Sequence, residues 1–400
     1  MANVFSALEK YQRTLSVIGH ATSGSRPRSR LRILHVSLSS DFGGRELRIL
    51  HEMLAMRERG HHLEVVCAAR SELGLQAQRH GFTAHAIEAA GTLASASVPL
   101  QITRVMRAGD FDVANTHSVA DDLRTALFVS LARTRLVVRT HHRECRNGVP
   151  RAFKTLSNCV MTVSDYQRHR YLGRGYTEHC VRTVHTGLDV QDPLPGSPSM
   201  RENFGIPADA MAIGALADEL DPGGLRTLVE ATCPLMQAHA GVHLVLGNLR
   251  EPQFTQLMRR ALEIGLLGKI HCPGHSLSAQ KLLAEIDIYA MVPELEVKGS
   301  TFIEACARGV PVIATAVGCI PEIIDNGVSG YVVLPFDRLA LRCAIGRLLE
   351  DSNVRVRFGE AGRAKFLVGR FSAAGMAQAV EGAYLEWLKV KADAAGTASR

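Results

Sequence analysis

Two glutamates lie on either side of a Gly-Ser-Thr sequence in the C-terminal half of the chain. Glu296 and Glu304 have seven residues between them, and Gly299-Ser300-Thr301 is expected to begin the helix that carries Glu304 about one turn in. A glycine lets the backbone approach a ligand closely, and the unpaired N–H groups at a helix start favour an anion. The pattern therefore fits a phosphate site flanked by two carboxylates that could accept hydrogen bonds from sugar hydroxyls.

A plainer interpretation of the same residues is also open. Both glutamates could be solvated charges, with Ser300 or Thr301 acting as a simple N-cap. The residues that follow favour the first interpretation, because residues 311–315 read as a buried strand, followed by Gly318 and by Pro321-Glu322-Ile323-Ile324. An isolated pair of glutamates would lack this context.

The elements that must position these residues are those of a parallel sheet. From residue 31 onward the chain alternates short apolar runs with longer helical patterns, which is typical of sheets with helices on both faces. Strands are expected at residues 32–38, 63–68, 112–117, 136–140, 160–164, 212–216, 243–246, 269–272, 288–292 and 312–315. Helices are expected at residues 45–59, 224–238, 337–350 and 373–390. Ligands of such sheets bind where the strands end.

The alternation predicts an α/β protein of two doubly wound domains that face each other across a cleft. The first is expected over residues 31–190 and the second over 209–372, with a proline-rich linker over 191–208 between them. A helix over 373–391 and a frayed tail over 392–400 complete the chain. Residues 1–30 read as an N-terminal extension, and a short helix over its residues 4–17 could contact a membrane.

Composition and charge narrow the class of protein. The 46 Lys and Arg exceed the 39 Asp and Glu, which gives a net charge of +7 at pH 7. This mild excess suits an anionic partner such as a nucleotide diphosphate or an acidic membrane surface. It would suit nucleic acid as well, but no nucleic-acid-binding motif accompanies it. Nine dispersed cysteines without a CxxC pair indicate thiols in a reducing cytosol, so a cytoplasmic protein is expected.

Other chemistries find little support. No GxGxxG follows the first strand, which disfavours a nicotinamide dehydrogenase, and no GxSxG elbow appears. His141-His142 lacks a third ligand at suitable spacing, so no metal site is expected. The acidic residues 218–221 read as a solvated turn. The basic runs 139–154 and 168–174 read as solvated faces or as a docking surface for an anionic membrane.

Residues 304–312 (EACARGVPV) resemble the signature of the retaining GT-B glycosyltransferases. That family includes bacterial mannosyl- and lipopolysaccharide glycosyltransferases and is related to glycogen synthases. It shows a Glu, seven residues, a Glu and then Ala-x-Ala-x-Gly-x-Pro-Val. The resemblance extends over roughly residues 32–390, since Gly43-Gly44 fits the family's glycine loop, and Thr116-His117-Ser118 and Thr140-His141-His142 fit its strand-end histidines.

The resemblance implies a GT-B architecture with an acceptor-side first domain and a donor-binding second domain. It also implies that the last helix, over residues 373–391, crosses back to the first domain. It implies that Glu296 contacts hydroxyls of the transferred sugar, and that Glu304 holds the ribose of a nucleotide sugar. The backbone over Gly299, Ser300 and Thr301 would bind the distal phosphate.

In the first domain, the resemblance places His141 near the reacting centre, and lets Gly43 and Gly44 close over the diphosphate. His117 could take part or could be a satisfied histidine at a strand end. The implied reaction retains the anomeric configuration, needs no metal and uses no cofactor besides the nucleotide sugar. The implied acceptor is a glycan or a lipid-linked molecule of the cell envelope, so the protein could sit peripherally on the inner face of the plasma membrane.

The chain departs from the family pattern where that pattern has cations. Ala215 stands where an Arg is expected just after the first strand of the second domain, and Gly223 stands where a Lys is expected. Losing one fixed donor of this kind can cost on the order of 10²–10³ in rate.

Three explanations of these departures are open. Lys298, Arg308 or Arg45 could supply the missing charge, although each could be an ordinary surface cation. The donor could instead carry a different phosphate arrangement. Alternatively, the protein could be a catalytically impaired member that binds or assembles with partners in glycan synthesis.

Overall fold

The computed structural model of the chain describes residues 30–88, 94–117, 134–142, 159–190, 199–274, 277–294, 299–367 and 369–398. Glu296, Lys298, the helix expected over residues 4–17 and the first part of the expected linker, residues 191–198, lie outside the described residues. The chain divides into a short unit, Met1–Leu31, and a long unit, Arg32–Arg400, and both sheets belong to the long unit.

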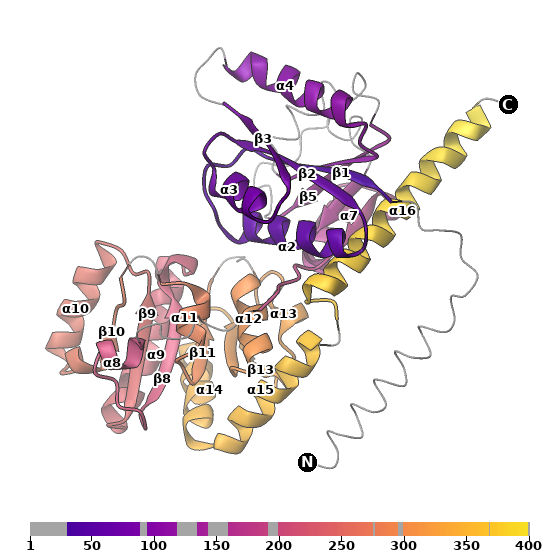
Figure 1. Ribbon diagram of the computed structural model, residues 1–400. Helices are drawn as coiled ribbons and strands as arrows, with labels where there is room; N and C mark the ends of the chain where they lie inside the picture. The colour runs from indigo at the N-terminus through magenta and orange to yellow at the C-terminus, as the bar shows by residue number, and fades with distance from the viewer. Residues whose placement is uncertain are drawn as a thin grey trace. The chain divides into compact units, whose positions relative to one another are not determined.

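Seven parallel strands form the sheet of the N-terminal domain, in the order β3-β2-β1-β4-β5-β6-β7 (Figure 1). They are β1 (Arg32–Ser37), β2 (His62–Ala68), β3 (Thr83–Ile87), β4 (Val113–Thr116), β5 (Leu136–His141), β6 (Cys159–Thr162) and β7 (Val181–Thr183). The α-helices described in this domain are α2 (Gly44–Glu58), α3 (Glu72–Arg79), α4 (Ala94–Gly109) and α7 (Asp165–Gly173). The strand order reverses between β1 and β4, where such sheets open a crevice for ligands.

Six parallel strands form the sheet of the C-terminal domain, in the order β10-β9-β8-β11-β12-β13. They are β8 (Met211–Leu216), β9 (Val242–Gly247), β10 (Ile270–His271), β11 (Ile288–Met291), β12 (Val312–Thr315) and β13 (Gly330–Val333). The main helices are α9 (Pro222–Ala238), α10 (Gln253–Glu263), α11 (Ala279–Leu283), α12 (Ser300–Arg308), α13 (Ile320–Ile323), α14 (Arg338–Glu350) and α15 (Ser352–Leu367). The predicted fold class of two doubly wound α/β domains is therefore confirmed.

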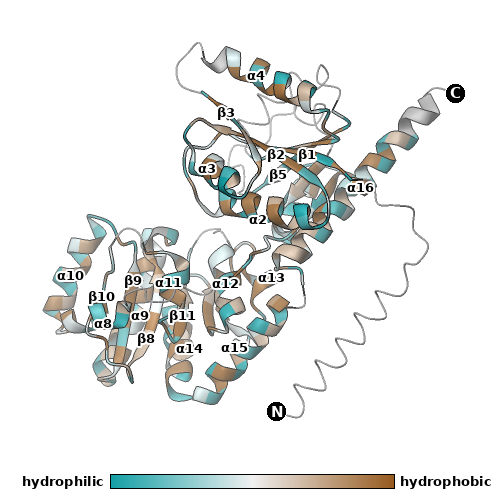
Figure 2. Cartoon of the chain, in the orientation of Figure 1, coloured by the Kyte–Doolittle hydropathy of each residue, from teal (hydrophilic) through white to brown (hydrophobic). Residues whose placement is uncertain are grey.

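Burial of both faces explains why the central strands could be predicted as apolar runs. Every residue of β5, β9 and β12 is buried. Parallel sheets that are covered by helices on both faces contain such runs, whereas half-exposed strands alternate. Figure 2 agrees, because the strands of the C-terminal sheet are coloured mainly towards brown while helices such as α10 carry both teal and brown residues.

The last helix, α16 (Ala373–Ala398), packs against the N-terminal domain although it follows the C-terminal domain in sequence. Tyr384 of this helix is fully buried, Trp387 donates its indole N–H to the carbonyl of His179 at 2.8 Å, and Glu381 forms an ion pair with Arg59. The N-terminal domain therefore depends on residues from the very end of the chain.

Two of the connections contain more helix than expected. The tail expected to fray from residue 392 continues α16 as far as Ala398, because its many alanines favour helix. Within the expected linker, α8 (Met200–Asn203) forms a short helix, and the Ser199 side chain caps it by accepting from the amide of Glu202 at 3.3 Å. None of the helices among the described residues combines the length and the apolar character needed to cross a bilayer.

Candidate functional site

The helix expected at the centre of the site, α12, begins at Ser300 with Gly299 as its N-cap. Neither Ser300 nor Thr301 caps it, since Gly299 holds the cap position without a side-chain hydrogen bond. A Cβ at Gly299 would stand 2.5 Å from Cδ1 of Ile323, so a larger residue here would force the Ile323 side chain of α13 to move. Among the described residues, no side chain caps the first turn of α12, whose backbone amides are those expected from the sequence to bind an anion.

A carboxylate of the protein itself lies beside this first turn. The buried hydroxyl of Thr301 lies 3.0 Å from each carboxylate oxygen of Glu219 and donates to this group. A negative charge near the N-terminus of a helix is favoured by the orientation of the peptide dipoles. The structure therefore places a protein anion next to the predicted phosphate position, a contact that the sequence did not reveal.

A second carboxylate occupies the start of α9. Asp221 accepts hydrogen bonds from the amides of Gly224 at 2.9 Å and Glu294 at 2.8 Å. Burial would raise the pKa of Asp221, but these amide hydrogen bonds outweigh it and hold the pKa below its usual value. The interpretation of residues 218–221 as a solvated turn was therefore wrong for Asp221, which is the N-cap of α9.

The structure explains both missing cations. Ala215 lies inside β8 and is fully buried, so it does not follow the strand as expected, and an arginine there would be a buried charge. A Cβ on Gly223 would clash with the carboxylate of Glu294, whose side chain fills that space. Burial and the neighbouring charge of Asp221 raise the pKa of Glu294. An acidic side chain thus occupies the space beside Gly223, where the family pattern has a lysine.

Glu304 lies about one turn into α12, at the start of its second turn, where the sequence predicted it. Its carboxylate accepts a hydrogen bond from Nε of Arg308 at 3.2 Å, and both side chains are mostly buried. Burial raises the pKa of Glu304, and the charge of Arg308 offsets part of this effect. Arg308 is thus the ion-pair partner of Glu304 and not an ordinary surface cation.

The glycine loop of the N-terminal domain leads directly into α2. Gly43 is the N-cap, and its amide donates to the carboxylate of Glu46 at 3.1 Å, which is one half of a capping box because glycine has no side chain to accept in return. Nε of Arg45 donates to the other oxygen of Glu46 at 2.6 Å. Gly44 is the first residue of the helix. Both Gly43 and Arg45 therefore form hydrogen bonds with Glu46. Glu46 was not among the residues predicted from the sequence.

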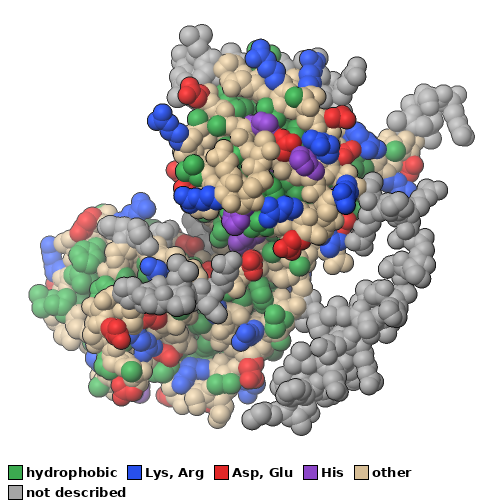
Figure 3. Space-filling view, viewed as in Figure 1, with side chains coloured by type: hydrophobic (Ala, Val, Ile, Leu, Met, Phe, Trp, Pro, Cys, Tyr) green, Lys and Arg blue, Asp and Glu red, His purple; other side chains and the backbone are tan. Residues whose placement is uncertain are grey.

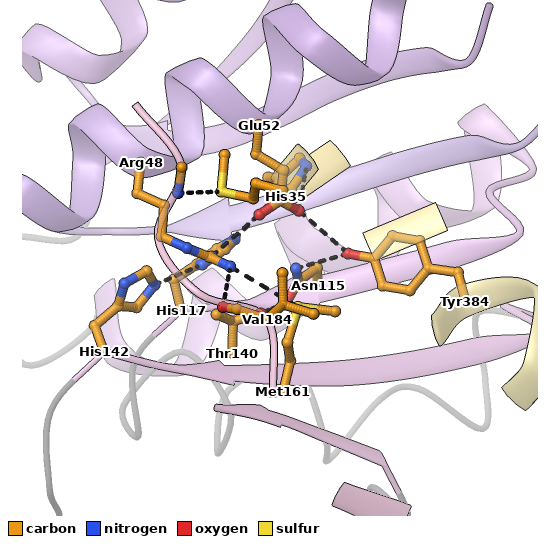
Figure 4. A network of polar contacts seen from close by, with 12 residues as sticks. His35, Arg48, Glu52, Asn115, His117, Thr140, His142, Met161, Val184 and Tyr384 are labelled. Atoms are coloured by element: carbon orange, nitrogen blue, oxygen red, sulfur yellow. Dashed lines mark hydrogen bonds and ion pairs between the residues drawn. The ribbon is translucent and has the colours of Figure 1, made fainter. Parts of the chain in front are cut away.

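The three strand-end histidines have different surroundings. His141 is buried, and its Nδ1 lies 2.7 Å from the hydroxyl of Tyr171. His117 lies between two other imidazoles, with Nε2 2.9 Å from Nδ1 of His35 and Nδ1 3.0 Å from Nε2 of His142 (Figure 4). His142 is the most exposed of the three. The structure thus joins His117 to His142 and directs His141 toward Tyr171.

The surface of this domain is rich in basic and imidazole groups. In Figure 3, histidine side chains reach the surface among Lys and Arg side chains over the first half of the N-terminal domain, from β1 to α4. Arg139, the first residue of the predicted basic run 139–154, lies in β5 and is only 1% exposed. This residue cannot belong to a membrane-docking face, and residues 143–154 of the run lie outside the described residues.

Glu322 makes contacts that the sequence analysis missed. Its two carboxylate oxygens accept from the amides of Asp165 and Tyr166, each at 2.8 Å, and one of them also contacts Nε2 of His185 at 2.9 Å. A residue of the C-terminal domain thus caps α7 of the N-terminal domain. The sequence signal was the Pro321-Glu322 pair, which was noted without a role.

In the part of the chain that the structure describes, Asp165, His185 and Glu322 form the group of side chains that could share a metal ion. Each has a hydrogen-bond partner within the protein, since Asp165 also accepts from the hydroxyl of Thr183 at 2.6 Å. These bonds account for the cluster as a contact between the two domains.

Two family models match the chain, one for each domain. The model described as Glycosyltransferase Family 4 matches residues 42–192, and the model described as Glycosyl transferases group 1 matches residues 223–365. The chain belongs to the GT-B glycosyltransferases. This result confirms the resemblance to GT-B glycosyltransferases that residues 304–312 carry.

Several curated relatives of this GT-B chain are glycosyltransferases by name. The lipopolysaccharide core biosynthesis glycosyltransferase LpsE of Rhizobium meliloti (strain 1021) is 29% identical over 192 residues, 48% of this chain and 53% of LpsE. The GDP-mannose-dependent alpha-(1-6)-phosphatidylinositol monomannoside mannosyltransferase of Mycolicibacterium smegmatis is 29% identical over 264 residues, 60% of this chain and 68% of that protein. The chain spans about half the length of LpsE and of several other curated relatives that it matches.

Solved structures agree on the fold. A glycosyltransferase from Rickettsia africae ESF-5 superposes with a TM-score of 0.79 at 21% identity, covering 90% of this chain and 99% of that one. Anabaena Alr3699/HepE in complex with UDP and glucose superposes with a TM-score of 0.74 at 20% identity, covering 88% and 98%. At these identities the likeness shows a shared fold.

Proposed function

We propose that the protein transfers a sugar, with retention of configuration, from a nucleotide-diphosphate sugar to a glycan or lipid-linked acceptor of the cell envelope. The observation that carries the proposal is α12, whose first turn offers uncapped amides and whose second turn carries the mostly buried Glu304. Amides at a helix start favour phosphate, and a carboxylate accepts well from the hydroxyls of a ribose. The match of both domains to glycosyltransferase families, and the lipopolysaccharide and mannosyl relatives, support the same reaction.

In this proposal the predicted residues of α12 keep their tasks, and one histidine takes the place of another. Glu304 holds the ribose, and the backbone from Gly299 to Thr301 binds the distal phosphate. His142 replaces His141 as the histidine nearest the sugar, because it is the more exposed of the two. The reaction needs no metal and no cofactor beyond the donor. We place the protein in the cytoplasm, with peripheral contact to an anionic membrane that holds the acceptor and without a nucleic-acid partner.

The proposal can be tested with purified protein, a panel of nucleotide sugars and a membrane extract as acceptor. Release of the nucleotide from one donor is expected, and Glu304→Gln should lower kcat/KM for that donor about ten- to hundred-fold, because a hydrogen bond to a charged group contributes about 1.5–3 kcal/mol. Glu263→Gln is the matched control, since Glu263 is an exposed residue of α10 paired with Arg260. Absence of turnover with every donor would contradict the proposal.

A second function is favoured by the acidic groups at the site. Glu219 lies at the first turn of α12, and Glu294 fills the space beside Gly223. Both groups oppose a bound diphosphate, as would be expected of an impaired GT-B protein that serves as a binding or assembly partner. Calorimetry with UDP, GDP and ADP separates the two functions. Binding that Glu304→Gln weakens supports the enzyme, whereas no binding of any of the three supports the partner.

A further inference from the structure

Three imidazoles form a continuous hydrogen-bonded chain from the interior of the N-terminal domain to its surface. His35 at the end of β1 bonds through Nδ1 to Nε2 of His117, and His117 bonds through Nδ1 to Nε2 of His142 (Figure 4). His35 and His117 are almost completely buried, whereas His142 is partly exposed. We call this the histidine chain. Its outer end, His142, is the residue that the proposed function places nearest the sugar.

The inner end of the histidine chain faces a buried carboxylate. Nε2 of His35 lies 3.9 Å from Oε1 of Glu52, which is itself fully buried in α2. Glu52 accepts from Nη1 of Arg48 at 3.1 Å through its other oxygen, Oε2. The pair of Arg48 and Glu52 supplies each charge with an opposite one, as buried ions require.

The hydroxyl of Tyr384 also reaches this carboxylate, at the end of a row of hydrogen bonds. Thr140 donates its hydroxyl to Oδ1 of Asn115 at 2.8 Å, Nδ2 of Asn115 donates to the hydroxyl of Tyr384 at 2.8 Å, and that hydroxyl points to Oε1 of Glu52 at 3.4 Å. Burial and the charge of Glu52 raise the pKa of Tyr384 well above its usual value, which keeps the phenol protonated and able to donate. Glu52 therefore accepts from Arg48 through one oxygen and from Tyr384 through the other.

When each of the three rings carries one proton, the hydrogen bonds of the histidine chain can be arranged in two ways only. Burial lowers the pKa of His35 and His117, so both rings are neutral and carry one proton each. In the first arrangement, all three rings are protonated on Nε2. In the second, all three are protonated on Nδ1. Any mixture places two protons or two lone pairs between neighbouring rings.

Glu52 distinguishes the two arrangements. Protonation on Nε2 points the N–H of His35 at the carboxylate, whereas protonation on Nδ1 points a lone pair at it, and a buried carboxylate strongly disfavours the latter. We propose that Glu52 fixes the tautomer of His142 through His35 and His117, so that His142 carries its proton on Nε2 and offers Nδ1 as an acceptor. Glu52, His35 and His117 are then positioning residues for His142.

The consequence for the reaction rests on the proposed function. An acceptor nitrogen on His142 suits a hydroxyl group of the donor sugar, which can donate a hydrogen bond to it. The tautomer itself is a property of the folded protein and exists whether or not a substrate is turned over. The two claims can therefore fail separately.

The tautomer can be read directly by NMR of protein labelled with 15N-histidine. Two-bond correlations between ring protons and ring nitrogens show which nitrogen is protonated, and His117→Gln and His142→Gln assign the signals. We expect protonated Nε2 and unprotonated Nδ1 for His142 in the wild type near pH 7.5. A protonated Nδ1 on His142 would overturn the proposal, and this measurement needs no variant of Glu52.

Glu52→Gln tests the cause. Arg48 donates to Oε2, so the new amide oxygen is expected there, which turns the NH2 group toward Nε2 of His35. The preferred arrangement then reverses, and His142 should change to the tautomer protonated on Nδ1. Glu381→Gln is the matched control, because Glu381 is also a buried carboxylate that pairs with an arginine and lies 3.4 Å from a histidine, His61, outside the histidine chain. His142 should keep its wild-type tautomer in this control.

Two results on the variants would overturn the proposal. One is a folded Glu52→Gln protein in which His142 keeps its proton on Nε2, and the other is the same tautomer change in Glu381→Gln. Where transferase activity is found, Glu52→Gln should also lower kcat/KM about tenfold, and Glu381→Gln should not. An inactive protein with the expected tautomers would contradict the proposed function and leave the role of Glu52 intact.

Discussion

Glu219 is the side chain that most affects the proposed donor site, because it holds a negative charge beside the amides expected to bind phosphate. Its carboxylate accepts from Thr301, the second residue of α12. Two like charges about 4 Å apart repel by about 4 kcal/mol at an effective dielectric constant of about 20. A diphosphate bound at this helix would therefore have to displace Glu219 or bind less tightly.

Replacement of Glu219 should consequently strengthen nucleotide binding. Glu219→Gln keeps the shape of the side chain and an oxygen that can accept from Thr301, and removes the charge. We expect the affinity for UDP or GDP to rise at least tenfold, and the gain to be larger at low ionic strength, where repulsion is less screened. Isothermal titration calorimetry at two salt concentrations measures both effects.

The same titrations with Glu230→Gln provide the control, since Glu230 is an exposed residue of α9 paired with Arg338. Its affinity should equal that of the wild type. An unchanged or weaker affinity in Glu219→Gln would mean that the phosphates bind away from the start of α12.

At the scale of elements, the sequence predicted the buried parts of the fold best. The strand expected over residues 312–315 is β12, and the one expected over 288–292 differs from β11 by one residue, because both are continuous apolar runs. β3, with the sequence TAHAI, was missed because it is half-exposed and carries few large apolar residues. Short elements such as β7 lack a pattern of sufficient length.

Contacts between distant elements could not be predicted from spacing. The start of α12 was found because glycine, serine and threonine mark a helix start, but its partner Glu219 is 82 positions away. Likewise, Glu322 lies 157 positions from the amide of Asp165 that it caps. Periodicity and caps report on neighbours along the chain, whereas these pairs form only when sheets of known order bring the elements together.

Glu322 provides the prediction at this scale, because it caps a helix of the other domain. Burial would raise its pKa, but the hydrogen bonds from His185 and from the amides of Asp165 and Tyr166 outweigh burial and lower the pKa. Glu322→Ala leaves these amides at the start of α7 without their acceptor. We expect the free energy of unfolding to fall by about 1–3 kcal/mol and hydrogen exchange of the two amides to become faster.

Exchange measured by NMR or mass spectrometry localises the effect to α7. Glu178→Ala is the control. Glu178 is exposed and lies after α7, and its carboxylate pairs with Arg168 of α7. Its stability should stay within about 0.5 kcal/mol of the wild type. If the amides of Asp165 and Tyr166 are equally protected from hydrogen exchange in Glu322→Ala and in the wild type, the hydrogen bonds to Glu322 do not persist in solution.

At the scale of the whole molecule, α16 joins the end of the chain to the first domain. Tyr384 of α16 belongs to the hydrogen-bonded groups around Glu52, and Glu386 pairs with Arg182 of β7. The resemblance to the family had implied a returning helix, but not that it completes a buried polar network. The surroundings of the histidine chain therefore include residues from both ends of the described chain.

Several histidines and carboxylates have lowered pKa values in the folded protein, and together they make its stability depend on pH in acid. Burial lowers the pKa of His35, His117 and His243, and burial together with the charge of His243 lowers the pKa of His271 to about 4. Hydrogen bonds outweigh burial and lower the pKa of the carboxylates of Glu64 and Glu285. For all of these groups the unfolded chain binds protons at a higher pH than the folded protein does.

Stability should therefore fall as the pH is lowered, in two ranges. The histidines are neutral in both states above about pH 6.5, and below it the unfolded chain gains protons that the folded protein excludes, down to about pH 4 for His271. The carboxylates add to the loss below about pH 4.5, as they become protonated first in the unfolded chain. Urea denaturation between pH 7.5 and pH 4 measures the free energy of unfolding across both ranges.

His271→Asn tests the histidine part of this dependence. His271 lies at the edge of the C-terminal sheet, where its Nε2 is 2.9 Å from Nδ1 of His243. Removal of its imidazole should make the slope of unfolding free energy against pH shallower by up to one proton between about pH 6.5 and pH 4. His80→Asn, which replaces an exposed histidine of the other domain, should leave the slope unchanged. Equal slopes in His271→Asn and the wild type would mean that His271 is protonated as readily in the folded protein as in the unfolded chain, so that its burial beside His243 does not exclude the proton.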